Sequence, residues 1–257
     1  MSARRAFALA TLALAAAAAH ADDDPACTPD TLETVDAWLA THPWKTGGTS
    51  PDLRVTAACK RSPVDPDVTI VAAAYGQDED DKNEIVALVD TRAGKVRATF
   101  IGVIDEDATT HVGSFAIDTA RYQLAPGLRA FGVDFHSTAY VSHAAEFRRE
   151  VERTLFIQEG ARLRPVLERF ALTTWNAVPG TDGSGELSHW TIAVASTRSH
   201  GLADLVVTRT TEPFDGTAPR RARGVLHFDG KSYGVDPNPG EGQALQPWPA
   251  ASAPAER

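Results

Sequence analysis

Short segments rich in β-branched and aromatic residues, separated by turn residues, run through this chain from Asp67 onward and constrain its fold most. Trp190, Ile192 and Val194 alternate with Thr and Ala, which is the period-two pattern of a strand. Ile85–Val89 is a continuous apolar run, as expected for a strand covered on both faces. The predicted strands are 68–75, 83–90, 96–104, 113–117, 129–137, 152–158, 166–174, 187–196, 204–211 and 221–228.

These segments predict a mainly β fold, an antiparallel β-sandwich-like arrangement with an N-terminal helix, and an incomplete β-propeller is the alternative. Thr91–Gly94 provides a turn between two predicted strands, which predicts a hairpin whose facing residue numbers sum to about 185. Tyr140, Ala144 and Phe147 have helical spacing, so a short helix is expected over 139–150.

The first twenty-one residues have the pattern of an export signal. Arg4 and Arg5 precede an apolar stretch that is too short to span a bilayer, and Ala19–Ala21 fits the small-residue cleavage rule. We therefore expect a signal peptide over 1–21 and a periplasmic or secreted protein, exported by the general secretory route, with the twin-arginine route as the alternative. A single β-rich domain is predicted over 22–235, followed by a disordered, Pro-rich tail over 236–257.

A helix is predicted near the start of the mature chain, at about 29–41. Thr28 suits the N-cap, Pro29 suits the first helical position, and Val35 and Leu39 lie on one apolar face. The chain has two cysteines, Cys27 and Cys59, and in an oxidising compartment they predict one disulfide that ties this helix to the body. A redox or metal-binding pair is the alternative.

The charge balance argues against some partners. The net charge is −9, and removal of the signal segment takes away Arg4 and Arg5 and no acidic residue, which makes it −11. This charge disfavours nucleic acid, which needs a basic face. No apolar run is long enough for a transmembrane segment. Arginines occur in three groups, which are expected to lie on a solvated face, and the alternative is that they bind an anionic partner. The groups are 148, 149 and 153; 162, 164 and 169; and 220, 221 and 223.

No catalytic motif is present in the sequence. The chain lacks G-x-S-x-G, S-x-x-K, H-E-x-x-H and the phosphate-binding P-loop. The leading hypothesis is therefore a non-catalytic exported binding module that takes an envelope protein or ligand as its partner. The alternatives are a metal-dependent hydrolase and a structural envelope protein whose tail contacts a partner.

The carboxylates at the open end of the 83–90/96–104 hairpin are the candidate functional residues. They are Asp78, Asp80, Asp81, Asp105 and Asp107. The hairpin register would place the two runs opposite each other, with Lys82 as the nearby cation. One interpretation is a pair of solvated loops that need no cofactor, and the alternative is a calcium site, although the spacing does not match an EF-hand.

Several short stretches resemble a group of secreted bacterial proteins without an assigned activity. The stretches are Ile117–Tyr122, Leu124–Gly127, Ala130–Val133, Gly201–Leu205, Phe228–Tyr233 and the pair Cys59-Lys60. The resemblance spans most of 55–235 and implies a β-rich, exported protein. It implies no catalytic residue.

Overall fold

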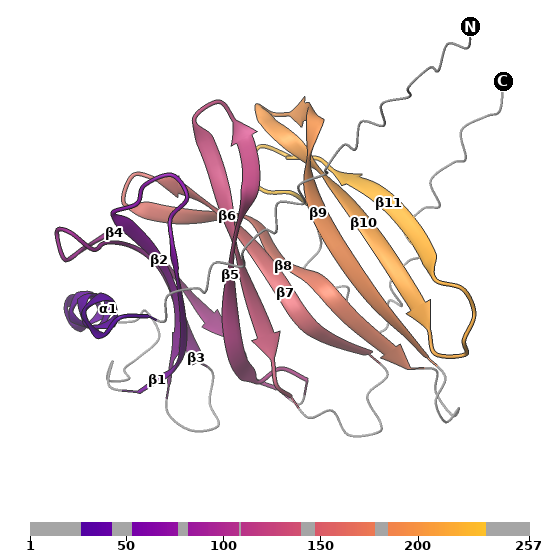
Figure 1. Cartoon of the computed structure of the whole chain (residues 1–257), viewed down its shortest axis with the longest axis horizontal. Helices are drawn as coiled ribbons and strands as arrows, with labels where there is room; N and C mark the ends of the chain where they lie inside the picture. The colour runs from indigo at the N-terminus through magenta and orange to yellow at the C-terminus, as the bar shows by residue number, and fades with distance from the viewer. Residues whose placement is uncertain are drawn as a thin grey trace, which may run out of the picture.

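The computed structural model describes residues 27–42, 53–76, 82–107, 109–139, 147–177 and 185–234, which form one helix and a sheet of 11 strands (Figure 1). The predicted signal segment and the predicted tail lie outside the described residues. No helix within these ranges is long and apolar enough to cross a membrane.

The elements follow one another along the chain with short connections. They are α1 (Pro29–Thr41), β1 (Arg54–Arg61), β2 (Val68–Tyr75), β3 (Lys82–Asp90), β4 (Lys95–Ile104), β5 (Val112–Ala125), β6 (Leu128–Ser137), β7 (Phe147–Glu159), β8 (Arg162–Ala177), β9 (Gly185–Ser199), β10 (Leu202–Pro213) and β11 (Arg220–Leu226). The predicted mainly β class with one N-terminal helix is confirmed.

The strands belong to one mostly antiparallel, hydrogen-bonded sheet. Its main path has the order β1-β2-β3-β4-β8-β7-β6-β5, and β9, β10 and β11 extend it from β8. The only parallel step along this path joins β4 to β8 through the single pair Thr99 and Arg162. The path bends so that its two end strands, β1 and β5, approach each other to Cα distances within 8 Å. The layered, sandwich-like character therefore comes from one curved sheet, whereas a propeller has separate blades.

Three apolar clusters fill the space on the two faces of the sheet. The first lies between β2–β4 and β5–β8 and contains the aromatic side chains Phe115, Phe131, Phe135 and Phe156. The second lies between β5–β8 and the strands β10 and β11. The third lies between α1 and the outer face of β1–β3. Strands β5–β8 thus contribute to two clusters, and β5, β7 and β8 are longer than the sequence pattern predicts.

The β3 strand confirms the interpretation of Ile85–Val89 as a run covered on both faces. Val86 and Leu88 belong to the first cluster, while Ile85, Ala87 and Val89 belong to the third, under α1. The predicted hairpin is also confirmed, because Lys82 faces Ile104 and Asp90 faces Lys95.

Helix α1 is held on the sheet by its cap, its apolar face and a disulfide. The Thr28 hydroxyl accepts a hydrogen bond from the Thr31 backbone N–H at 3.3 Å, as expected of an N-cap. Val35 and Leu39 are buried against β2 and β3. The predicted Cys27–Cys59 disulfide is present, with Cα atoms 5.1 Å apart, and ties the start of the helix to β1.

The structure corrects two sequence predictions and adds one strand that was not predicted. The helix expected over 139–150 is wrong for its last four residues, which begin β7 and pair with β8, while 140–146 lie outside the described residues. The β1 strand was not predicted, because its central Ala-Ala-Cys lacks β-branched residues. Arg153 does not lie on a solvated face, since its side chain is only 13% exposed.

Arg153 forms the centre of a buried polar network across β5, β6 and β7. Its guanidinium donates to both carboxylate oxygens of Asp134, each at 2.6 Å, to the Tyr122 hydroxyl at 2.6 Å, and is also paired with Asp118. Burial disfavours the charge, but the hydrogen bonds and charge of Asp134 raise the pKa of Arg153 above its usual value. Gly132 gives the stem room, because a Cβ there would lie 3.2 Å from Arg153 Cδ.

We predict that Arg153→Ala lowers the free energy of unfolding by about 3–5 kcal/mol, because it leaves the buried Asp134 carboxylate without its bidentate partner. Chemical denaturation at neutral pH measures this change. Arg121→Ala, an exposed arginine on β5, is the matched control and should change stability by less than about 0.5 kcal/mol. Equal effects of the two substitutions would contradict the role of the network.

Candidate functional site

An open groove of about 530 Å³ lies where the two end strands of the sheet path meet. Its lining residues are Cys27, Leu32, Arg54, Val55, Thr56, Ala57, Ala58, Cys59, Phe115, Ala116 and Ile117. They come from the start of α1, from β1 and from the middle of β5. The residues are mostly small and apolar, so the groove offers apolar contacts and backbone groups rather than a cluster of charges.

The groove exists because β1 and β5 lie side by side without pairing. Within the described residues, β1 pairs only with β2, and β5 only with β6, and no backbone ladder joins β1 to β5. Strands that share a ladder lie about 4.8 Å apart, whereas packed sheets are about 10 Å apart. The Cα atoms of β1 and β5 approach within 8 Å without sharing a ladder, and the groove lies along this seam.

The two walls of the groove differ in how their residues are oriented. On β5, Phe115 and Ile117 point into the first apolar cluster and are buried, while Ala116 between them is exposed. On β1, a bulge at Val55 disturbs the register with β2, and this side chain is 47% exposed. Bulges bend a strand and leave one residue outside the ladder, which here opens the end of the groove.

Arg54 is the one charged residue among the described residues that line the groove, and its charge is compensated. Its guanidinium lies 2.8 Å from Asp36 of α1, whose second oxygen accepts a hydrogen bond from the Tyr75 hydroxyl at 2.7 Å. Burial lowers the pKa of Arg54, but Tyr75 and Asp36 raise it further, so the net shift is upward. Arg54 therefore fixes the helix on the strand and adds little net charge to the groove.

The predicted acidic site is only partly described. Asp105 and Asp107 are exposed residues after β4, and Asp78, Asp80 and Asp81 lie outside the described residues. Asp107 accepts hydrogen bonds from the Thr109 backbone N–H at 2.7 Å and from its hydroxyl at 2.9 Å. Among the described residues, no group of three acidic, His or Cys side chains is arranged to hold a metal ion. Calcium binding at this hairpin end stays a prediction.

Charged residues at the same end of the sheet are buried, which the sequence did not predict, although Lys82 was expected near the acidic runs. Lys82 forms an ion pair with Glu106 at 2.9 Å, and both side chains are less than 10% exposed. Burial would raise the pKa of Glu106, but hydrogen bonds from Lys82 and from the Val112 backbone lower it below its usual value. Glu106 therefore turns inward between the two exposed aspartates, which no local sequence pattern indicates.

Glu84 is the most weakly compensated of these buried groups. It is 8% exposed, and its partner is Arg169 on β8, at 3.9 Å. Arg169 has a positive φ of 46°, lies over the Phe135 ring at 5.0 Å and also pairs with Glu152 at 3.4 Å. Burial raises the pKa of Glu84 more than the charge of Arg169 lowers it.

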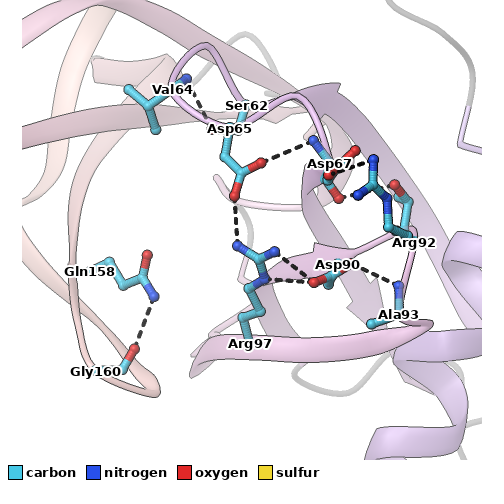
Figure 2. A network of polar contacts seen from close by, with 11 residues as sticks. Ser62, Val64, Asp65, Asp67, Asp90, Arg92, Ala93, Arg97, Gln158 and Gly160 are labelled. Atoms are coloured by element: carbon cyan, nitrogen blue, oxygen red, sulfur yellow. Dashed lines mark hydrogen bonds and ion pairs between the residues drawn. The ribbon is translucent and has the colours of Figure 1, made fainter.

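A polar network at the opposite end of β2–β4 is structural (Figure 2). Arg97 on β4 donates to Asp65 of the β1–β2 turn at 2.7 Å and to Asp90 of β3 at 2.6 Å. Hydrogen bonds from Arg97 lower the pKa of Asp65, and the Ala93 backbone N–H does the same for Asp90. Every charge in this exposed network is matched, so it joins two hairpin turns and offers no binding group.

A Ser-His-Asp arrangement near the β9–β10 turn does not have the geometry of a nucleophilic site. Asp204 is 1% exposed, and its Oδ1 lies 3.2 Å from Nδ1 of His227. The Ser199 hydroxyl lies 3.2 Å from the same nitrogen. A catalytic triad needs the acid and the nucleophile on different imidazole nitrogens, so that the ring can pass a proton between them. Ser199 and His227 therefore cover the buried Asp204 near the end of the strand.

Comparison with known proteins adds no relative: no protein-family model, no curated protein and no solved structure matches this chain. The function is therefore inferred from the geometry of the sites described above. Of the sites described, the groove between β1 and β5 is the one that offers an open volume.

We predict that Glu84→Gln stabilises the protein at neutral pH. The raised pKa means that the folded state favours the protonated carboxyl, so the stability from this group is present at acid pH and is lost as pH rises through its folded pKa. Glutamine mimics the protonated form, so the free energy of unfolding at pH 7.5 should rise by roughly 1 kcal/mol, which corresponds to a rise in Tm of about 2–4 °C. At pH 4 the rise in Tm should be less than about 1 °C, because the carboxyl is already protonated.

Thermal unfolding of Glu84→Gln at both pH values checks this prediction. Glu168→Gln, an exposed glutamate on β8, is the matched control and should leave Tm unchanged at either pH. A fall in Tm of Glu84→Gln at pH 7.5 would show that the ion pair with Arg169 outweighs the cost of burial.

Proposed function

We propose that this chain is an exported, non-catalytic binding protein and that the groove between β1 and β5 is its binding site. The observation that carries the proposal is the open seam between two end strands that lie within reach of each other and do not pair. Loops and edges presented by a rigid β framework are common binding surfaces in proteins without chemistry of their own.

Export is supported by two features. The first twenty-one residues have the pattern of a signal peptide, and the Cys27–Cys59 disulfide is typical of oxidising compartments. We therefore place the protein in the periplasm or outside the cell, where its partner would be an envelope protein or an exported ligand.

The groove also has the rigidity that a binding site needs. One wall is fixed by the disulfide at Cys59 and by the Arg54–Asp36 ion pair, and the other belongs to β5, whose Phe115 and Ile117 are anchored in the core. A preorganised site loses little conformational entropy when it binds, which favours recognition.

Site-specific photo-crosslinking in the native host tests this proposal. A photoreactive phenylalanine analogue placed at Ala116 faces the groove, and the same group at Ala120, an exposed alanine further along β5, is the matched control. We expect a discrete crosslinked adduct from position 116 and none from position 120, with the adduct identified by mass spectrometry. The oxidised Cys27–Cys59 bond verifies that each variant is exported and folded.

A second substitution shows whether the adduct depends on the groove. Thr56→Arg, on the facing wall, should reduce the adduct at position 116 at least tenfold by filling the groove. Absence of an adduct at 116 in correctly oxidised protein, or equal adducts at 116 and 120, would contradict the proposal.

A further inference from the structure

We infer that the outer face of strands β8–β11 binds an acidic polysaccharide, that is, a sugar chain that carries carboxylate groups. This surface is separate from the groove, which is built by α1, β1 and β5, so the inference goes beyond the proposed function. Strands β9, β10 and β11 lie at the end of the molecule opposite to α1 (Figure 1). The arginines, the hydroxyl groups and an exposed aromatic ring on this face support the inference.

The side chains of β9 and β10 alternate between a packed face and an outer face. Trp190 and Ile192 of β9, like Leu205 and Val207 of β10, pack in or against the second apolar cluster. Because successive residues of a strand point to opposite faces, the residues between them lie on the outer face. The ladders that join β10 to β9 and to β11 are regular from Leu205 to Thr211, so residues paired across them share a face.

Arg221 and Arg223 of β11 give the outer face its positive charge. Both are exposed, and in the ladder they pair with Thr210 and Thr208 of β10. Neither side chain takes part in an ion pair within the described part of the chain, whereas Arg220, on the opposite face, is paired with a glutamate of β9. The Cα atoms of the two outer arginines are about 7 Å apart along the strand. Guanidinium groups bind carboxylates well, so this pair is complementary in charge to an acidic ligand.

Polar side chains continue across the sheet from the two arginines. From Thr210 one row runs to His189 of β9 and on to Thr173 of β8. From Thr208 a second row runs to Thr191 of β9. Hydroxyl groups both donate and accept hydrogen bonds, and a neutral imidazole does the same with its two nitrogens. These rows therefore suit a ligand that is itself rich in hydroxyl groups, which favours a sugar chain over an anionic lipid surface.

Two aromatic rings lie at one end of the same face. Trp175 of β8 pairs with Leu187 of β9, which pairs with Glu212 of β10, so all three share the outer face. The Phe214 ring, directly after β10, is 6.5 Å from the Trp175 ring. Arg148 lies over Trp175 at 5.9 Å, so the 44% exposed Phe214 is the ring open to a ligand. The apolar CH groups on one face of a sugar ring stack on an exposed aromatic ring, while its hydroxyls remain free to bind polar groups.

The face has room for several sugar units and a net positive charge. Phe214 and Thr208 are six residues apart, which is about 20 Å along an extended strand. Among the described residues of β9–β11 that follow the alternation, Glu212 is the one acidic side chain on the outer face, against two arginines. A sugar chain along β10 would stack one ring on Phe214 and bring its carboxylates to the arginines.

Titration calorimetry of the oxidised protein with uronic-acid oligosaccharides tests this inference. The probes are hexamers of galacturonate, of mannuronate and of hyaluronan, each compared with its methyl ester, which has the same sugars without the charge. We expect at least one acidic hexamer to bind, and its ester to bind at least tenfold more weakly. Absence of binding by all three hexamers at millimolar concentration, or equal binding of a hexamer and its ester, would overturn the inference.

Substitutions on the exposed face then locate the binding. The double variant Arg221→Gln/Arg223→Gln should weaken binding of the acidic hexamer at least tenfold, while Arg220→Gln, on the same strand and the opposite face, is the matched control and should weaken it less than threefold. Phe214→Ala should weaken the hexamer and its ester by the same factor, because stacking does not depend on the carboxylates. Hexamer binding that is insensitive to the double variant places the sugar elsewhere and overturns the inference.

Cosedimentation with phosphatidylglycerol vesicles separates a sugar ligand from a lipid surface. We expect no sedimentation. Sedimentation that is lost in the double variant, without binding of any hexamer, overturns the inference and assigns the face to a membrane surface. The crosslinked adduct at position 116 should form equally in the double variant, because the groove lies on other strands. Failure of either proposal therefore leaves the other standing.

Discussion

A hydrogen-bonded sheet must end somewhere, and the rest of this structure depends on how its ends are arranged. Interior strands satisfy their backbone groups on both sides, whereas each end strand leaves one row of donors and acceptors unpaired. Here the main path of the sheet curves until its two end strands, β1 and β5, lie beside each other without pairing, while β11 ends the branch that leaves from β8. On its outer face β1 packs under α1, and β5 is anchored in the first apolar cluster through Phe115 and Ile117.

The long central strands make this curvature possible. Strands β5–β8 contribute to both the first and the second apolar cluster, and on β7 the first cluster takes Phe156 while the second takes its neighbours Leu155 and Ile157. Arg153 spans β5, β6 and β7 near the point where strand β5 shifts its register between Asp118 and Tyr122. A charged network at such a place provides hydrogen-bond partners for polar groups beside an irregular ladder, and its cost is the burial of a guanidinium.

Much of the framework could be predicted from local sequence, but the site could not. The Ile85–Val89 run, the β3–β4 hairpin, the helix cap at Thr28 and the disulfide all depend on short-range patterns and are confirmed. The buried state of Arg153 was missed because an arginine in a strand usually lies on the wet face. The groove was missed for a different reason: it joins residues 54–59 to residues 115–117, and only the curvature of the sheet brings them together.

The disulfide has a consequence for where in the cell this protein can work. Both of its cysteines line the groove. A chain with reduced cysteines lacks the covalent tie between the start of α1 and β1. On the proposed function, completion of the groove is then coupled to oxidation of the two cysteines, so the groove of a chain in a reducing compartment would lack one of its fixed walls.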